Sequence, residues 1–178
     1  NIEIIKPDDW HVHFREGSIL ERLVPETSKL FNRAIVMPNL TTPIVSSKQV
    51  LKYKNQILNF SDNNKYFEPL MTFYLNEEIS KKEIINAFKN KLIFALKLYP
   101  SGATTNSSKG VKKISNVFHI FEIMSKFKIP LLIHGEVNDK KIDVFEREKV
   151  FIENELMTIH TKFPELKITL EHITSKFA

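Results

Sequence analysis

The sequence of 178 residues contains no cysteine. Within these residues a disulfide framework, a cysteine nucleophile and a thiolate metal site are therefore excluded, and any metal ion must be held by histidine, carboxylate or modified side chains. Long apolar runs are absent as well, because no segment approaches the roughly 20 residues that a membrane-spanning helix needs, and "NIEIIKPDD" lacks the pattern of a signal peptide. We therefore expect a cytoplasmic protein without a membrane partner.

Glycine is scarce, with only four in the chain. Neither G-x-G-x-x-G nor G-x-x-x-x-G-K-[ST] occurs, which argues against the glycine-rich loops that hold nucleotide phosphates. The formal net charge is +5 and the pI is about 9.3, but the lysines are scattered over segments with helical spacing and form no basic block with interleaved aromatics. A solvated surface explains that distribution better than a nucleic-acid partner does.

Short apolar runs alternate with segments of helical spacing along the chain. The runs with the length of buried strands are "IEII", "RAIVMPN", "EPLMTFYL", "LIFALKLYP", "IPLLIHGEV" and "LKITLEHIT". Helices are predicted over "SSKQVLKYKNQIL", "SKKEIINAFKN", "SNVFHIFEIMSKF" and "IDVFEREKVFIENELMTIHTKF", and the second of these begins with a capping box of Ser80 and Glu83. Repeated units of one strand and one helix indicate an α/β protein with a parallel sheet.

Two architectures contain such a sheet, an open doubly wound sheet and a (β/α)8 TIM-type barrel, and the lack of phosphate-binding glycine loops favours the barrel. A complete barrel has eight of these units, whereas only about the first six are present. We therefore expect residues 1–178 to form one barrel domain that is truncated at its C-terminal end. Such a domain would leave strand edges unpaired.

Polar residues recur where the predicted strands end, which is the end at which barrel enzymes carry their chemistry. His11 and His13 lie two residues apart and so point the same way from a strand, as ligands of one metal ion would. Such a pair also occurs among ordinary buried histidines. The other residues at strand ends are Asn39, Lys97, His134 and His172. Their convergence favours a metal site over a chance pair.

Lys97 interrupts the apolar strand "IFALKLYP", where Ala95, Lys97 and Tyr99 share one face. One interpretation is a lysine that reaches solvent from the strand end or pairs with an acid. The interpretation we favour is a desolvated, neutral amine that adds carbon dioxide, because the resulting carbamate can bridge two metal ions as a carboxylate does. Nitrogen and oxygen ligands of this kind suit hard and borderline cations.

Three further polar residues receive no functional role. His119 and His160 lie in segments of helical spacing, and we expect both on outer helices. Strand alternation places Glu171 on the outer side if His172 faces inward, so that Glu171 would need a polar partner among the helices.

Residues 99–110, "YPSGATTNSSKG", form a loop by composition. The loop is either an exposed connector or a mobile lid whose Thr104 and Thr105 donate hydrogen bonds to an anionic substrate. The sequence leaves both interpretations open.

Long motifs in a fixed order resemble the dihydroorotase family of the amidohydrolase superfamily, in its single-function bacterial-type class. They run nearly from end to end of the chain: "KPDDWHVHFR", "RAIVMPNL", "PLMTFYL", "KLYPSGATTNSSKGV", "PLLIHGEV", "IDVFERE" and "EHITSK". The activity that the resemblance implies is the reversible, zinc-dependent cyclisation of N-carbamoyl-L-aspartate to L-dihydroorotate in de novo pyrimidine biosynthesis. It also implies a homodimer.

Position by position, the resemblance implies two zinc ions that are bridged by a carboxylated Lys97. The other implied metal ligands are His11 and His13 for the first ion and His134 and His172 for the second. The implied substrate-binding residues are Arg15, Asn39, Thr104 and Thr105. The two zinc ions would generate the hydroxide that attacks the ring amide, and Arg15 suits a planar carboxylate.

The family's catalytic aspartate follows the eighth strand and is not found before Ala178, so we expect these residues alone to lack normal catalysis. An alternative is another cyclic-amide hydrolase, such as a hydantoinase or an allantoinase. Arg15, Asn39 and the threonine loop favour dihydroorotate over those substrates. A second alternative is a non-catalytic barrel fragment that acts as an assembly partner, against which the retained metal-site residues argue.

Overall fold

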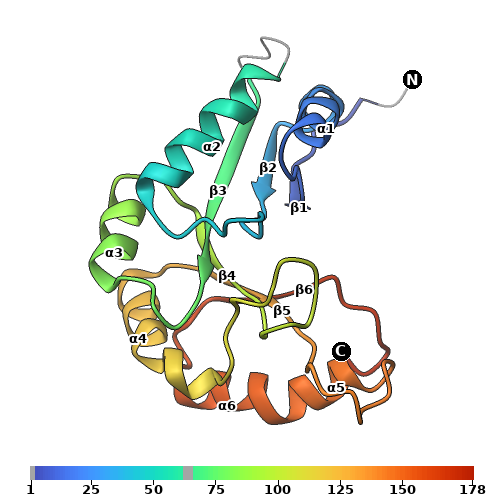
Figure 1. Ribbon diagram of the computed structural model, residues 1–178, viewed down its shortest axis with the longest axis vertical. Helices are drawn as coiled ribbons and strands as arrows, with labels where there is room; N and C mark the ends of the chain where they lie inside the picture. The colour runs from blue at the N-terminus through green and yellow to red at the C-terminus, as the bar shows by residue number, and fades with distance from the viewer. Residues whose placement is uncertain (1–2, 62–65) are drawn as a thin grey trace.

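Six parallel strands form a half-barrel in the computed structural model, which describes residues 3–61 and 66–178 (Figure 1). The strands pair in chain order, and each one hydrogen-bonds to the next. They are β1 (Asp9–Val12), β2 (Arg33–Val36), β3 (Glu68–Leu75), β4 (Ala95–Leu98), β5 (Leu131–His134) and β6 (Ile168–Glu171). The arrangement is consistent with part of a TIM barrel, so the predicted fold class is confirmed.

One strand prediction is wrong. The run "IEII" is not a strand where the structure describes it, at residues 3–5, and the first strand instead begins at Asp9. Ile4 and Ile5 are 77% and 93% exposed. A short branched apolar run does not become a strand without a neighbour to pair with and a face to bury.

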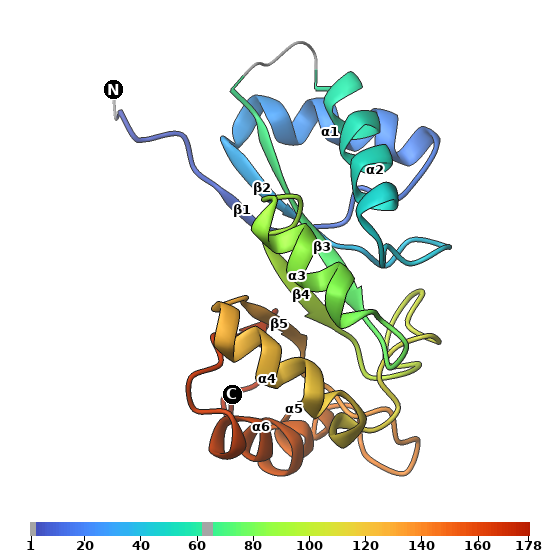
Figure 2. The same cartoon turned by 90° about the vertical axis from the view of Figure 1, so that its left-hand side faces the viewer.

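Helices follow the strands and cover the outer face of the sheet (Figure 2). They are α1 (Ser18–Leu30), α2 (Ser47–Asn59), α3 (Lys81–Lys89), the short 3-10 helix η1 (Ile114–Val117), α4 (Phe118–Phe127), α5 (Arg147–Phe151), the π-helical turn η2 (Ile152–Leu156) and α6 (Met157–Lys162). The first of these was not predicted, and it carries Pro25 in its interior. No helix in the described ranges is both long and apolar enough to cross a membrane.

The predicted capping box at α3 is half right. The Ser80 hydroxyl accepts the backbone N–H of Glu83, as an N-cap should. The Glu83 carboxylate, however, accepts the backbone N–H of Ser47 at 2.5 Å and so joins the start of α3 to the start of α2. Because the neighbouring helix offers an unpaired N–H, Glu83 satisfies a donor there and not in its own helix.

The main core lies between the sheet and the helices. Alternate strand residues such as Leu96, Leu98 and Ile133 pack there with helix residues such as Ile84 and Phe121, and all five are completely buried. Each such side chain stabilises the fold by about 1.5–3 kcal/mol relative to full exposure. This packing aims the other face of each strand toward the barrel interior.

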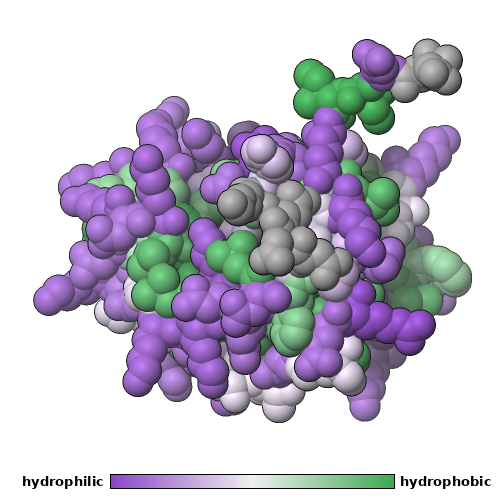
Figure 3. Space-filling view, turned by 90° about the horizontal axis from the view of Figure 1, so that it is seen from above, coloured by the Kyte–Doolittle hydropathy of each residue, from purple (hydrophilic) through white to green (hydrophobic). Residues whose placement is uncertain are grey.

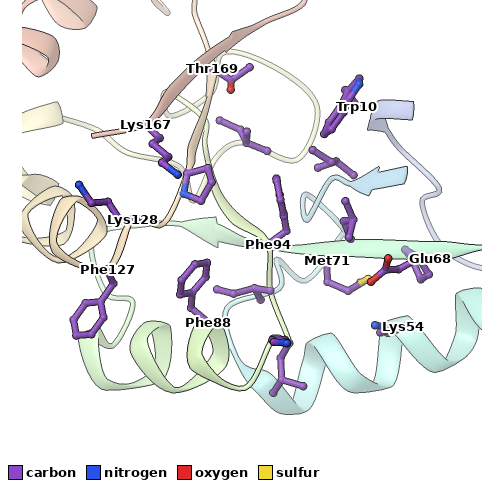
Figure 4. Close-up of a pocket in the computed structure, with 18 of the residues that line it drawn as sticks. Trp10, Lys54, Glu68, Met71, Phe88, Phe94, Phe127, Lys128, Lys167 and Thr169 are labelled. Carbon is purple, nitrogen blue, oxygen red and sulfur yellow. The ribbon is translucent and has the colours of Figure 1, made fainter. Parts of the chain in front are cut away.

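The inner face of the sheet carries a smaller apolar cluster of Ile35, Met37, Ala95 and Leu132. A cavity of about 940 Å³ runs along this face, with Trp10, Phe94 and Thr169 around it (Figure 4). Several lining residues directly precede strands or begin them, so the cavity opens toward the N-terminal ends of the strands, opposite the histidines described below.

The face seen in Figure 3 is dominated by hydrophilic side chains, with smaller apolar areas between them. Exposed apolar side chains on described residues include Phe145 at 83% and Val144 at 59%. Scattered apolar residues are normal on a folded surface.

Candidate active site

The predicted histidines meet at the carboxyl ends of the strands. His11 and His13 share a direction from β1, and their Nε2 atoms lie 3.0 Å apart. His134 ends β5, and its ring centroid lies 4.6 Å from that of His172, which directly follows β6. The rings of His11 and His172 are 5.4 Å apart and join the two pairs. The four imidazoles therefore form one cluster across the half-barrel.

His172 reaches this cluster through an unusual backbone conformation. Its φ is 41°, in the left-handed region that few side chains adopt without support. This turn ends the alternation of β6, so that Glu171 and His172 both face the site. The prediction that Glu171 points outward is therefore wrong: its side chain is 5% exposed and contacts Lys97 and His11 inside the half-barrel.

Lys97 is completely buried on the inner face of β4, as the strand pattern predicts. Its Nζ is paired with the Glu171 carboxylate and lies 5.0 Å from the centre of the Tyr99 ring. Burial lowers the pKa of the Lys97 amine, although the charge of Glu171 opposes that effect. The unmodified lysine therefore pairs with an acid, as in the first of the two interpretations of Lys97 given by the sequence.

Three histidines of the cluster, His13, His134 and His172, are neutral near pH 7. Burial lowers the pKa of His13 to about 4 and that of His134 to about 3, with nearby positive groups adding to the shift. Burial also lowers the pKa of His172. Neutral imidazole is the form that binds metal ions.

Unsatisfied nitrogens fit the chemistry of a metal site. Among the described residues, the buried polar side-chain atoms without a hydrogen-bond partner are His11 Nδ1, His13 Nδ1 and His134 Nε2. Two of these atoms nevertheless have a carboxylate nearby, since His11 Nδ1 lies 3.0 Å from Glu171 Oε1 and His134 Nε2 lies 3.7 Å from Glu136 Oε2. Buried polar atoms without a hydrogen bond are costly, so an additional ligand would stabilise this cluster. Within the same ranges, however, no three histidine or acidic side chains are arranged closely enough to hold an ion. The donor set suits a metal, but the ligands are not in a closed coordination geometry.

Asn39 lies beside the histidine cluster and is 2% exposed. Its Oδ1 accepts the hydroxyl of Tyr99 at 3.0 Å, and its Nδ2 donates to the backbone carbonyl of Thr105 at 2.9 Å. Burial raises the pKa of Tyr99, so the phenol keeps its proton and acts as the donor. Asn39 therefore has a defined amide orientation.

Arg15 lies three residues after the end of β1 and approaches the same place. Its guanidinium is 3.4 Å from the backbone oxygen of Asn39, and its φ is 60°. The hydroxyl of Tyr53 holds this conformation by donating to the Arg15 carbonyl at 2.7 Å. Arg15 and Asn39 thus bring a cation and an amide together, which suits a carboxylate.

The loop of residues 99–110 folds over Asn39. Asn106 donates its side-chain amide to the Asn39 carbonyl at 3.1 Å, while Thr104 and Thr105 are exposed. Gly110 lies where the loop closes, because a Cβ there would come within 2.3 Å of the Tyr99 carbonyl oxygen. The loop is thus more than an exposed connector, since its backbone meets the predicted substrate-binding residue.

The two histidines without a predicted functional role lie on outer helices, as expected. His119 is half-buried on α4 and His160 is exposed on α6, both outside the cluster. Sequence reasoning missed Glu171, Asn106 and the hydroxyl role of Tyr99. The signal for Tyr99 was its position two residues after Lys97 on the inner face, whereas nothing local marked Asn106.

Dihydroorotases are among the known proteins that are similar to this chain in sequence and in structure. A dihydroorotase of Buchnera aphidicola subsp. Schizaphis graminum is 50% identical over 177 residues, which are 99% of this chain and 51% of that protein. The crystal structure of dihydroorotase from Campylobacter jejuni matches with a TM-score of 0.88 and 37% identity, over 97% of this chain and 49% of that one. The chain is similar to these dihydroorotases along nearly its whole length. No protein-family model matches it.

The chain spans about half the length of these dihydroorotases. A dihydroorotase from Saccharomyces cerevisiae, solved in complex with 5-fluoroorotic acid, matches with a TM-score of 0.86 and 35% identity over 95% of this chain and 48% of that one. An L-hydantoinase from Arthrobacter aurescens has a TM-score of 0.70 at 15% identity, over 92% of this chain and 40% of that one, and shares the fold alone. The identity to the two dihydroorotase structures is thus more than twice the identity to the hydantoinase.

Proposed function

We propose that this chain supplies the metal-binding and substrate-binding half of a dihydroorotase, which interconverts N-carbamoyl-L-aspartate and L-dihydroorotate. The observation that carries the proposal is the cluster of four histidines around the strand ends, with the buried Lys97 behind it and Arg15 and Asn39 beside it. The dihydroorotase that is 50% identical to this chain supports the proposal.

We infer two zinc ions as the cofactors of this site. His11 and His13 would hold one ion, His134 and His172 the other, and a carboxylated Lys97 would lie between them. Bound zinc would lower the pKa of a water molecule and polarise the amide carbonyl. The Nε2 atoms of His11 and His13, which face one another at 3.0 Å, support the inference.

The part of this chain in the reaction is to bind and orient the substrate. Arg15 would bind the substrate carboxylate through two parallel hydrogen bonds, which also fix the direction of the ring. Asn39 would add its Nδ2 donor on the same side, since Tyr99 already occupies its Oδ1. Thr104 and Thr105 would donate their hydroxyls from the loop. We assign no proton-transferring group to these residues.

The biological setting is proposed on the family resemblance. We infer a cytoplasmic homodimer that acts on a small molecule and binds neither nucleic acid nor membranes. Sedimentation of the full natural protein at several concentrations would test the dimer, which is contradicted by a monomer at every concentration.

The proposed function is tested with the full natural protein. We expect it to contain two zinc ions per chain and to interconvert dihydroorotate and carbamoyl aspartate, followed by chromatography of both compounds. Hydantoin and allantoin serve as comparison substrates and should be turned over at least a hundredfold more slowly. Turnover of either in preference to dihydroorotate would favour the alternative hydrolases, and zinc-free protein without any turnover would favour the non-catalytic partner.

A further inference from the structure

Glu171 is a buried carboxylate that touches two of the candidate metal ligands. It is 7% exposed, and it lies at the end of β6. One carboxylate oxygen, Oε2, is paired with Nζ of Lys97 on β4. The other, Oε1, lies 3.0 Å from Nδ1 of His11 on β1. A single side chain thus connects three strands across the interior of the half-barrel.

We propose that Glu171 is a positioning residue of the metal site, which orients His11 so that its Nε2 faces the metal position. The proposal rests on the proposed zinc-binding function and extends it to a residue outside the ligand set. Glu171 would touch neither the metal nor the substrate, and it would act through His11.

The geometry around the His11 ring carries this inference. Its Nε2 lies 3.0 Å from Nε2 of His13, so these two nitrogens define the place where an ion would be shared. A carboxylate beside Nδ1 favours the tautomer with the proton on Nδ1, which leaves the lone pair of Nε2 free for the metal. Nδ1 of His11 lies 3.0 Å from Oε1 of Glu171, so the carboxylate is the acceptor that faces this nitrogen.

The contact with Lys97 explains how Glu171 is held in place before any metal binds. Both carboxylate oxygens have a partner, so the side chain cannot turn away from His11 without also losing its buried contact with Lys97. A ligand held in its binding orientation loses less conformational freedom when the metal arrives. Glu171 therefore prearranges the site in the metal-free protein.

Two variants and one matched control test this role in the full natural protein. Glu171→Ala removes both contacts, whereas Glu171→Gln keeps an oxygen that can accept the Nδ1–H of His11. The control is Glu165→Gln, because Glu165 is a 76% exposed carboxylate that pairs with Lys128 on the surface. Circular dichroism of each variant establishes that it folds before it is compared.

The first measurement is the tautomer of His11 in metal-free protein, from correlation of ring protons with ring nitrogens by NMR. We expect the proton on Nδ1 in the natural protein, in Glu171→Gln and in Glu165→Gln. In Glu171→Ala we expect a mixture with the Nε2–H form. An unchanged tautomer in Glu171→Ala would overturn the proposal, and so would an Nε2–H form in the natural protein.

The second measurement is zinc affinity by competition with a chelator. Glu171→Ala should bind zinc roughly 10–100-fold more weakly, which is the usual effect of losing a residue that orients a metal-binding histidine. Glu171→Gln should lose less, and Glu165→Gln should match the natural protein. Equal affinities in Glu171→Ala and the natural protein would overturn the positioning role, whereas a natural protein that binds no zinc would overturn the proposed function itself.

Discussion

The side chain of Asn39 donates a hydrogen bond from Nδ2 to the backbone oxygen of Thr105 at 2.9 Å, across 66 residues of sequence. This bond uses one of the two N–H groups of the amide, and the other remains for the proposed substrate carboxylate. The Tyr99 hydroxyl on the other side of the amide prevents it from flipping. Thr105 and Tyr99 therefore fix the orientation of the Asn39 amide from both sides before a substrate binds.

Replacing Tyr99 by phenylalanine should weaken substrate binding and leave the metal site intact. Tyr99→Phe removes the hydroxyl that orients the Asn39 amide, and a hydrogen bond of this kind contributes about 1 kcal/mol, or about fivefold. We expect KM for dihydroorotate to rise by about that factor with kcat nearly unchanged. The zinc content is the control and should remain at the natural value. Loss of zinc, or an unchanged KM, would contradict this role.

We expect Lys97 to be essential for zinc binding, and we expect this effect to be separable from its contribution to the free energy of unfolding. Lys97→Met keeps a similar volume but leaves Glu171 without the charge that it now pairs with, and the free energy of unfolding should fall by about 3 kcal/mol. The double variant Lys97→Met with Glu171→Gln removes both charges and should recover most of that loss.

Neither variant should bind zinc in the two-ion stoichiometry, because neither has an amine to carboxylate. Urea unfolding and metal analysis give the two readouts. Full zinc occupancy in the Lys97→Met protein would rule out the bridging role.

Glu148 on α5 should stabilise the turn that carries His172. Its carboxylate is 6% exposed and accepts the backbone N–H groups of Thr174 and Ser175 at 3.1 and 2.8 Å. Glu148→Ala removes both bonds, and we expect a loss of about 3 kcal/mol in urea unfolding, since hydrogen bonds to a charged group are stronger than average. The control Glu153→Ala changes an exposed acid on η2 and should stay within about 0.5 kcal/mol of the natural protein. Equal losses in both variants would contradict a specific role.

The stability of metal-free protein should fall as the pH drops below about 6.5. Burial lowers the pKa of His13 from 6.5 to about 4 and that of His134 from 6.5 to about 3. Between those values and 6.5 the unfolded chain binds protons that the folded chain does not, so acid favours unfolding, whereas above about pH 7 the contribution is constant.

Urea unfolding at pH 7.5, 6 and 5 measures this dependence. The double variant His13→Gln with His134→Gln should show a smaller loss between pH 7.5 and 5, and the exposed His160→Gln should behave as the natural protein does. An identical pH dependence in the double variant would show that the buried histidines do not cause it.

Much of the fold follows from local patterns. Branched apolar runs of strand length predicted β2 to β6. The prediction succeeded because each of these runs has a neighbouring strand to pair with and a face to bury against helices. The run "IEII" failed for the same reason, since it has no face to bury at residues 3–5. The helix α1 was overlooked because Pro25 is a helix breaker in most interiors, yet the helix continues through it here.

The sequence by itself determined which side chains reach the interior, because strand alternation places Lys97 inward and gives His11 and His13 one direction. The tertiary structure alone decided how His172 and Glu171 are used. The left-handed φ of His172 breaks the alternation, and the hydrogen bonds of Glu148 to the following backbone hold that turn. A partner 26 residues earlier in the chain leaves no trace in the local pattern around residue 172, so only the folded chain brings Glu171 beside Lys97 and His11.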